Sequence, residues 1–419
     1  MNIDVQNYIE SLGINAKAAE PEVSALTEPQ KNAVLKVIAE KLRGSTDEIL
    51  AANAADIAAA EACGMSKSMI DRLTLTAERI EGIAQGVEKV ISLPDPIGAV
   101  IGGGDLANGL HIVKKRVPIG TVGIIFESRP NVTVDAASLC FKAGNTVILR
   151  GGSDAINSNK ALVSLMRGAL AQCGHNENGI QLVENTDRAA AAALMKLNKY
   201  VDLLIPRGGG GLIRTIIENS TIPVIQTGEG NCHVYVDSSA DVDMAVSIVN
   251  NAKTQRPSVC NAIESILVHR DIAPAFFAKL DELWQGRVAV VGDEATAALI
   301  HVEGIACDAD YATEFLDYKL SSKVVDSVEE AIEHINRFGT RHSECIVTRD
   351  IANAELFQRR VDAAAVYVNA STRFTDGYEF GLGAEIGIST QKLHARGPMG
   401  LEALTTYKYL INGNGQIRG

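Results

Sequence analysis

The sequence is poor in aromatic residues, proline and long apolar runs, and each shortage excludes a class of protein. Aromatic residues make up 5% of the 419 residues, so the cores must consist mainly of Ala, Val, Ile and Leu. Only 11 residues are Pro, which excludes a proline-rich scaffold, and 46% are hydrophobic, which excludes a disordered chain. No stretch approaches the roughly 20 unbroken apolar residues of a membrane helix. We therefore expect a globular protein without a membrane partner.

Positive charge is also in short supply, and the cysteines show no pairing pattern. The 51 Asp and Glu residues outnumber the 39 Lys and Arg residues, and the net charge of −12 argues against a nucleic-acid partner. The seven cysteines form no CxxC motif and no zinc-ribbon spacing, so they indicate neither a disulfide framework nor a metal site. The chain does not start with a basic segment and an apolar one, so we expect no secretion signal and a cytoplasmic location.

Hydrophobic periodicity predicts a helical segment followed by two α/β series. The first ninety or so residues are expected to be helical, with a capping box at Thr27–Gln30. Alternating strands and helices then follow, with strands expected at 121–126, 146–150, 180–184, 201–205 and 223–226. A second series begins near Ala245, with strands expected at 265–268, 288–291, 323–326, 345–348 and 364–369. This pattern predicts an α/β fold of two lobes, each with a parallel sheet, and a ligand site between them.

Two further strands have no obvious partner in either series. They are expected at 110–117 and 405–411. Unpaired strands often join a sheet in a second subunit, so these two predict a homo-oligomer.

Two segments after predicted strands could bind phosphate. Gly208–Gly211 opens a helix, where glycines let a phosphate approach backbone N–H groups, although the pattern matches neither GxGxxG nor a P-loop. Arg150–Ser153 lies at another strand end of the same sheet, and an arginine fork suits phosphate. The alternatives are a tight turn at the first segment and a solvated arginine at the second.

Cysteine is the plausible strong nucleophile, because the sequence has no GxSxG or HExxH motif. Cys140 and Cys345 lie on apolar elements and are expected to pack in a core. Cys260 follows Arg256 and Pro257 in a polar segment, where the proline ends the preceding helix and the arginine could stabilise a thiolate. The alternative is that Cys260 is a small buried hydrophobic residue.

Residues 126–131 and 142–152 resemble the aldehyde dehydrogenase superfamily, which reads PWNFP and AGNTVVLKP in the corresponding places. Further segments are similar to one branch, the γ-glutamyl phosphate reductase family, at 127–133, 207–211, 226–233 and 255–262. The resemblance extends over nearly the whole chain.

The resemblance implies an aldehyde dehydrogenase-like fold. A Rossmann-type nucleotide-binding domain is expected over residues 1–97 and 119–247, and an α/β catalytic domain over 248–400. Oligomerisation strands are expected over 98–118 and 401–419, where the two strands without partners fall.

The resemblance also implies a reaction. Members of this branch reduce L-glutamyl 5-phosphate to L-glutamate 5-semialdehyde and phosphate, the second step of proline biosynthesis, through a thioester on a cysteine that corresponds to Cys260. Ser128 or Asn131 is expected to donate to the oxyanion. Arg256 and Arg373 are candidates for the anionic groups of the substrate, and Arg396 is a third. Coupling to glutamate 5-kinase is expected.

The cofactor is expected to be NADPH/NADP⁺. Arg150 and Ser153 stand where NAD-preferring relatives carry a lysine and a glutamate, so a 2′-phosphate meets a positive charge and no carboxylate. Gly208, Gly209 and Gly210 are expected to contact the cofactor, and Glu314 its nicotinamide ribose.

Water is expected to be a poor acceptor of the acyl group. Hydrolytic relatives activate a water molecule with a glutamate, whose place Thr227 takes here, with Glu229 as the nearest carboxylate in the sequence. A threonine hydroxyl cannot act as a base near neutral pH.

Two alternatives stay open at this point. Another acyl-phosphate reductase, such as an aspartate semialdehyde dehydrogenase, would use a histidine base, and no His lies within eight residues of Cys260. A catalytically silent nucleotide-binding protein would keep the fold, but it would not need an intact Cys260.

Overall fold

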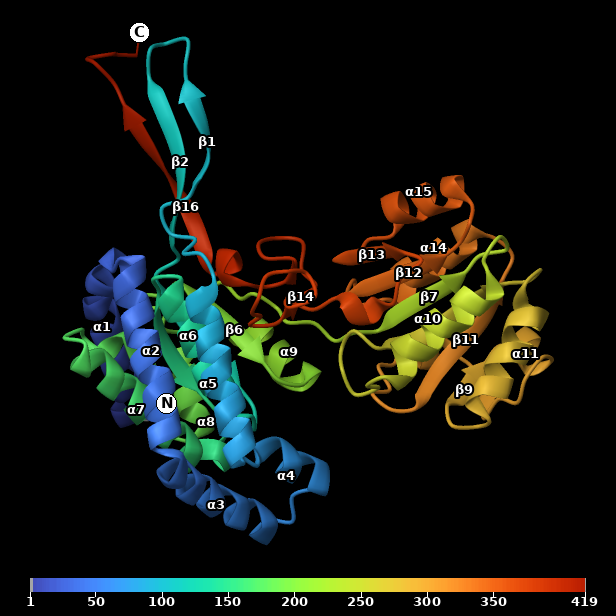
Figure 1. Cartoon of the computed structure of the whole chain (residues 1–419), viewed down its shortest axis with the longest axis horizontal. Coiled ribbons are helices and arrows are strands. Elements are labelled where there is room, and N and C mark those ends of the chain that lie inside the picture. Colours follow the sequence, from blue (N-terminus) through green and yellow to red (C-terminus); the bar gives the residue numbers. More distant parts are fainter. Residues whose placement is uncertain (1–2, 419) are drawn as a thin grey trace. The chain divides into compact units, whose positions relative to one another are not determined.

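The computed structural model of the chain describes residues 3–418, which divide into two compact units (Figure 1). The first unit takes residues 1–226, 382–387 and 399–419, and the second takes 227–381 and 388–398. The start of the chain at Met1 and Asn2, where we expect no secretion signal, lies outside the described residues, as does Gly419. From residue 3 to residue 418, no helix is long and apolar enough to cross a membrane.

The first unit begins with the predicted helical segment, which is confirmed. Its helices are α1 (Ile3–Ala25), α2 (Glu28–Gly44), α3 (Thr46–Ala62), α4 (Lys67–Leu73) and α5 (Ala77–Ser92). The predicted capping box starts α2, where the Thr27 N–H donates to Oε1 of Gln30 at 2.9 Å. The apolar positions of α2, such as Leu35 and Ile38, are buried, as its periodicity requires.

A four-stranded parallel sheet follows, in the order β5-β4-β3-β6. Its strands are β3 (Thr121–Phe126), β4 (Thr146–Arg150), β5 (Ile180–Leu182) and β6 (Leu203–Arg207). The helices between and after them are α6 (Pro130–Lys142), η1 (Ser153–Ala155), α7 (Ile156–Gln172), η2 (Glu177–Gly179), α8 (Arg188–Leu194) and α9 (Gly210–Asn219). The strand order reverses between β3 and β6, and ligands of open α/β sheets bind at such a switch point.

The strand that was predicted over residues 223–226 is reduced to a single paired residue in the structure. Only Val224 pairs, in an isolated bridge to Leu204 of β6. Pro223 cannot donate a hydrogen bond to a neighbouring strand, which limits the pairing.

The two strands without a predicted partner pair with each other inside one chain. β2 (His111–Pro118) lies between β1 (Val100–Asp105) and β16 (Thr405–Asn412) in an antiparallel sheet. The residue pattern alone does not predict β1, because half of it is glycine, although the resemblance implies strands over 98–118. Gly103 has φ +130°, and a Cβ there would lie 2.1 Å from the carbonyl oxygen of Ile112, so the close pairing requires glycine.

The second unit contains a seven-stranded parallel sheet, in the order β10-β9-β11-β8-β7-β12-β13. Its strands are β7 (Cys232–Val236), β8 (Ile263–His269), β9 (Ala289–Gly292), β10 (Gly304–Ile305), β11 (Lys319–Val325), β12 (Ser343–Val347) and β13 (Ala365–Val368). Its helices are α10 (Val242–Thr254), α11 (Ala273–Trp284), α12 (Glu294–Ala297), α13 (Asp308–Tyr311), α14 (Val328–Phe338), α15 (Ile351–Arg360) and η3 (Thr372–Phe374). The short strands β14 (Ile388–Ser389) and β15 (Gly397–Pro398) pair with each other, and η4 (Leu401–Leu404) precedes β16.

The predicted start of the second series near Ala245 is wrong, because β7 precedes α10. All residues of β7 are buried, and the strand pairs with β8 and β12. Residues 227–247 consequently pack in the second unit.

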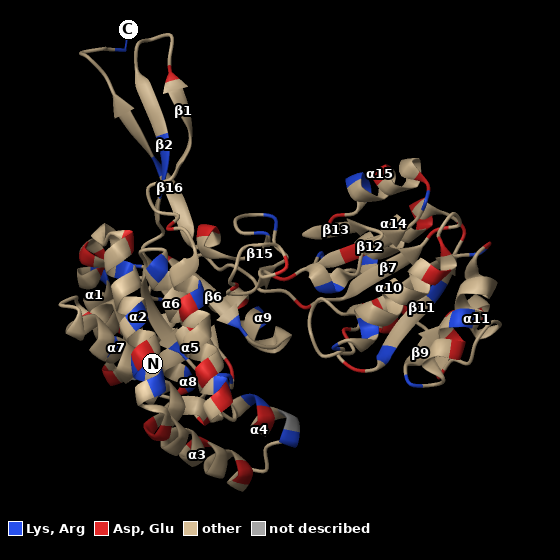
Figure 2. Ribbon diagram, viewed as in Figure 1, with Lys and Arg blue, Asp and Glu red and all other residues tan. Residues whose placement is uncertain are grey.

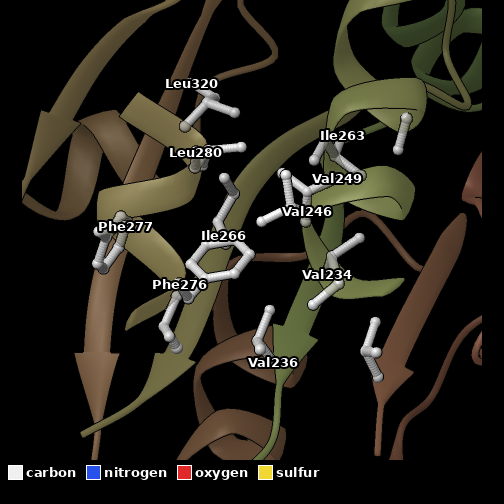
Figure 3. Close-up of a cluster of buried hydrophobic side chains, with 14 of the residues drawn as sticks. Val234, Val236, Val246, Val249, Ile263, Ile266, Phe276, Phe277, Leu280 and Leu320 are labelled. Atoms are coloured by element: carbon white, nitrogen blue, oxygen red, sulfur yellow. The ribbon is translucent and has the colours of Figure 1, made fainter. Parts of the chain in front are cut away.

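Apolar side chains from α10 and α11 pack on the sheet of the second unit (Figure 3). Val246 and Val249 of α10 and Phe276 of α11 lie over Val234 of β7 and Ile266 of β8 (Figure 3). This core supports the end of α10 and the start of β8, and the turn between these two elements carries Cys260. Outside the core, acidic and basic positions are mixed along the helices of each unit (Figure 2).

Candidate active site

Cys260 lies in the turn between α10 and β8, in the polar segment that the sequence predicts. We call residues 255–262 the nucleophile loop, which is bounded by Thr254 of α10 and Ile263 of β8. Cys260 is half-buried, whereas Cys140 and Cys345 are fully buried, as expected of packing residues. Burial raises the pKa of the Cys345 thiol to about 12, and it also raises that of Cys140. Neither buried thiol forms a thiolate near neutral pH.

Two arginines place positive charge at the nucleophile loop: Arg256 is part of the loop, and Arg373 lies in η3. The pKa of Arg373 is lowered, first by burial and then by the charge of Arg256, while Cys260 acts in the opposite direction. The carbonyl oxygen of Arg373 accepts from Nδ2 of Asn261, the residue after Cys260, at 3.3 Å. The Nε of Arg373 donates to Oε1 of Gln255 at 2.8 Å, which ties η3 to the loop. The structure thus brings Cys260, Arg256 and Arg373 together, and nearby cations favour a thiolate.

Arg396, the third predicted arginine, has a different partner. Its Nη2 donates to Oδ1 of Asp362 at 2.8 Å, and Lys392 contacts the same carboxylate at 2.9 Å. Its charge is therefore already paired.

Asn261, the residue after Cys260, fastens the nucleophile loop to the segment of Arg373. Its Nδ2 donates to the carbonyl oxygens of Arg373 at 3.3 Å and Thr375 at 3.0 Å. Its own carbonyl oxygen accepts from Oγ1 of Thr372 at 2.7 Å. This role is not predictable from the sequence, because an asparagine beside a cysteine carries no spacing signal.

Glu314 also lies at the nucleophile loop. Its Oε1 accepts from the N–H of Gly230 at 2.6 Å, and a Cβ on Gly230 would lie 1.5 Å from the carbonyl oxygen of Cys260. Burial raises the pKa of Glu314, an effect that the Gly230 N–H opposes. The thiol of Cys232 donates to the same carbonyl oxygen at 3.1 Å. Gly230 thus contacts both Glu314, the predicted ribose-binding residue, and Cys260, the predicted nucleophile.

Thr227 is buried, with 5% of its surface exposed, and it forms an isolated bridge with Ser389. Glu229 is exposed, and its charge acts on Glu314. Thr227 carries no carboxylate, and its correspondence to the base of hydrolytic relatives stays a prediction.

The two oxyanion candidates lie in the first unit, at the end of β3 and the start of α6. The hydroxyl of Ser128 donates to Oδ2 of Asp154, and Nδ2 of Asn131 donates to Oδ2 of Asp135 at 3.0 Å. Burial raises the pKa of Asp135 to about 6, although Asn131 opposes the shift. Since an amide has two N–H groups, Asn131 keeps a second donor, whereas the one hydroxyl proton of Ser128 is already used.

Arg150 and Ser153 lie together at the carboxyl end of β4. The Nη2 of Arg150 donates to the carbonyl oxygen of Thr186 at 3.3 Å, and its buried Nε has no partner among residues 3–418. Burial lowers the pKa of Arg150, and the neighbouring Asp154 raises it. Ser153 is exposed. A buried, unsatisfied guanidinium donor can bind a phosphate, and Arg150 and Ser153 remain predicted cofactor contacts.

The glycine run after β6 faces the carboxylate of Glu127, a contact that the sequence does not reveal. The N–H of Gly209 donates to Oε2 of Glu127 at 3.0 Å, and a Cβ on Gly208 would lie 2.6 Å from the carboxyl carbon of Glu127. The missing side chain of Gly208 therefore makes room for Glu127. A carboxylate here offers an acceptor to a hydroxyl group and repels a phosphate. Gly208, Gly209 and Gly210 remain predicted cofactor contacts.

Comparison with known proteins identifies the family. Residues 5–300 match the aldehyde dehydrogenase family. The chain is 56% identical over 407 residues to the γ-glutamyl phosphate reductase of Caldicellulosiruptor bescii, covering 96% of this chain and 97% of the relative. It is 54% identical to that of Moorella thermoacetica over the full length of both chains. The crystal structure of the Thermotoga maritima γ-glutamyl phosphate reductase has 48% identity and a TM-score of 0.96, covering 98% of this chain and 100% of that chain. The chain therefore belongs to the aldehyde dehydrogenase family, and within it to the γ-glutamyl phosphate reductases.

Proposed function

We propose that the chain reduces L-glutamyl 5-phosphate to L-glutamate 5-semialdehyde and inorganic phosphate, with NADPH as the reductant, as the second step of proline biosynthesis. The observation that carries the proposal is the half-buried Cys260 in a loop that contains Arg256 and is hydrogen-bonded to Arg373. The chain that carries this loop is 54% identical, over its whole length, to the γ-glutamyl phosphate reductase of Moorella thermoacetica.

Cys260 begins the reaction as a thiolate. Its sulfur attacks the acyl carbon, a C–S bond forms, and the C–O bond to phosphate breaks with its electron pair leaving on phosphate. The product is a thioester on Cys260. When the nicotinamide cofactor is bound, it supplies the hydride that reduces this acyl group to the aldehyde level. Cys260 then leaves as a thiolate, ready for the next cycle.

Charge around the nucleophile loop serves the substrate as well as the thiol. L-Glutamyl 5-phosphate carries a phosphate and an α-carboxylate, and Arg256 and Arg373 are our candidates to bind these anions. Each tetrahedral oxyanion needs a hydrogen-bond donor. Asn131 is the better candidate, because its amide has a second N–H group that can donate, and Ser128 is the alternative.

The cofactor contacts in this proposal are the ones that the resemblance implies. Arg150 and Ser153 receive the 2′-phosphate, Gly208, Gly209 and Gly210 lie along the cofactor, and Glu314 accepts from the nicotinamide ribose. This set predicts preference for NADP(H) over NAD(H).

The proposal includes a homo-oligomer in the cytoplasm, with functional coupling to glutamate 5-kinase. The exposed apolar side chains of β16, including Tyr409 and Ile411, suit contact with a second copy. Sedimentation velocity tests the oligomer, and a species at the single-chain mass of 44.5 kDa would contradict it.

The reverse reaction gives the most direct test. Purified protein with L-glutamate 5-semialdehyde, phosphate and NADP⁺ should form NADPH, and aspartate 4-semialdehyde should be a much poorer substrate. A preference for the aspartate compound would favour the other class of acyl-phosphate reductase. Tight NADPH binding without turnover of any acyl phosphate would indicate a silent relative.

A further inference from the structure

A buried ion pair joins the two ends of the nucleophile loop. Lys253 lies in the last turn of α10, just before the loop, and Glu264 is the second residue of β8, just after it. The Nζ of Lys253 lies 2.7 Å from Oε2 of Glu264, and both side chains are 0% exposed.

Stability alone does not explain this pair. Burial lowers the pKa of Lys253 and raises that of Glu264 to about 7, while each charge opposes the shift of the other. Well-packed apolar residues of similar volume are often at least as stable as a buried ion pair. The pair should therefore have a role that apolar side chains cannot fill.

The second carboxylate oxygen of Glu264 accepts a hydrogen bond from another segment of the chain. This bond is something that an apolar side chain could not provide. Oε1 of Glu264 accepts from the N–H of Leu316 at 3.2 Å. Leu316 has φ +56°, in the left-handed region that a leucine rarely adopts. The carboxylate thus stabilises an unfavourable backbone conformation two residues after Glu314.

Further contacts connect the segment of Glu314 to Cys260, the proposed nucleophile. Glu314 accepts from the N–H of Gly230, and Gly230 packs directly against the backbone of Cys260. Glu264 consequently touches the segment of Glu314 through one oxygen and the end of α10 through the other.

We propose that Glu264, held by Lys253, is a positioning residue that fixes the nucleophile loop and the Glu314 segment in a single arrangement. The inference rests on the proposed function, in which Cys260 is the nucleophile and Glu314 binds the ribose. Neither Lys253 nor Glu264 needs to touch substrate or cofactor for this role.

Two double variants separate positioning from charge. Lys253→Met/Glu264→Leu removes both charges and the acceptor for Leu316, while Lys253→Met/Glu264→Gln removes both charges but keeps an amide oxygen for Leu316. We expect kcat/KM to fall roughly a hundredfold in the Leu variant, as for a displaced catalytic group. The Gln variant should recover most of that loss. Equal activity of the two variants would overturn the proposal.

Alkylation of Cys260 by iodoacetamide, followed across pH, gives a readout that does not depend on turnover. The Leu variant should react more slowly, with a midpoint at higher pH, because the thiolate loses its fixed place among the arginines. A wild-type profile in the Leu variant would contradict the proposal. If wild-type protein alkylates at Cys260 but does not turn over, the proposed function fails while the positioning result stands.

The chain offers a matched control in the first unit. Nζ of Lys31 lies 2.7 Å from Oδ2 of Asp95, with side chains 0% and 11% exposed, and Oδ1 of Asp95 accepts from the N–H of Ile97. Lys31→Met/Asp95→Leu should therefore remove a similar pair and leave the alkylation profile unchanged. The same shift in this control would overturn the proposal.

Glu264→Asp decides the question if the Leu variant does not fold. The shorter side chain keeps the charge beside Lys253 but cannot reach both partners. Reduced kcat/KM with an upward shift of the alkylation midpoint supports positioning, and wild-type values contradict it.

Discussion

At the end of β4, two side chains set the cofactor preference in our proposal. Arg150 has an unsatisfied buried donor, and Ser153 adds an exposed hydroxyl without negative charge. Ser153→Glu should lower the ratio of kcat/KM for NADP⁺ to that for NAD⁺ by about tenfold, because a carboxylate repels the 2′-phosphate. Ser153→Gln is the control of similar size without the charge. A wild-type preference for NAD⁺ would refute this account of the two residues.

Thr227 is predicted to stand where hydrolytic relatives carry the glutamate that activates water. A threonine hydroxyl neither accepts a proton nor ionises near neutral pH, so it cannot act as a general base. Semialdehyde oxidation should therefore require phosphate or arsenate. Thr227→Glu should raise NADP⁺ reduction in phosphate-free buffer severalfold, and Thr227→Gln should not. The melting temperature of each variant checks that the buried site, 5% exposed in the wild type, accepts the larger side chain. Equal wild-type rates with and without phosphate would assign the base elsewhere, with Glu229 as the first candidate.

Single residues were predictable where chemistry and local sequence agree. Cys260 stands out because Pro257 ends the helix before it, and the resemblance indicates Glu314. Asn261 and Glu264 were not predictable, since their partners lie 114 and 52 positions away in the chain. Long-range hydrogen bonds leave no periodic pattern in the sequence.

At the scale of elements, the contact between the segment before β7 and the nucleophile loop leaves no room for a side chain at Gly230. A Cβ on Gly230 would lie 1.5 Å from the carbonyl oxygen of Cys260, so one of the two segments must move if the glycine is replaced. Gly230→Ala should lower kcat at least tenfold and cost about 2 kcal/mol of folding free energy. Gly304→Ala is the control, since a Cβ there meets no atom within 4 Å. Unchanged kcat in Gly230→Ala would show that the loop tolerates displacement.

Element boundaries were predictable where a mostly apolar run ends sharply. β3 and β4 have their predicted bounds, because β-branched runs end at polar or glycine residues. β7 was missed because its sequence begins with Cys232 and His233, two residues without strong strand preference. The residue pattern does not indicate β1, because its glycines suit pairing that only tertiary structure reveals, and only the resemblance places strands over 98–118.

At the scale of the whole molecule, buried histidines couple folding to pH. Burial lowers the pKa of His342 to about 4, below its ordinary value of 6.5. The unfolded chain then binds a proton that the folded chain does not, so stability falls as pH decreases from 6.5 toward 4. At pH 5 this single group costs about 2 kcal/mol of the stability present at neutral pH. His342→Asn should therefore lose less stability than the wild type between pH 7 and pH 5, as measured by urea unfolding. An equal loss would show that other groups dominate.

Cys260 carries the acyl group in the proposed reaction. The most direct measurement compares wild-type and Cys260→Ser protein in phosphate-dependent reduction of NADP⁺ by L-glutamate 5-semialdehyde, with Cys63→Ser, at an exposed cysteine, as the control. We expect Cys260→Ser to lose roughly 10⁴-fold or more of kcat while it keeps its melting temperature and its affinity for NADPH. Iodoacetamide should inactivate the wild type by labelling Cys260, and substrate should protect it. Wild-type activity in Cys260→Ser would contradict the account.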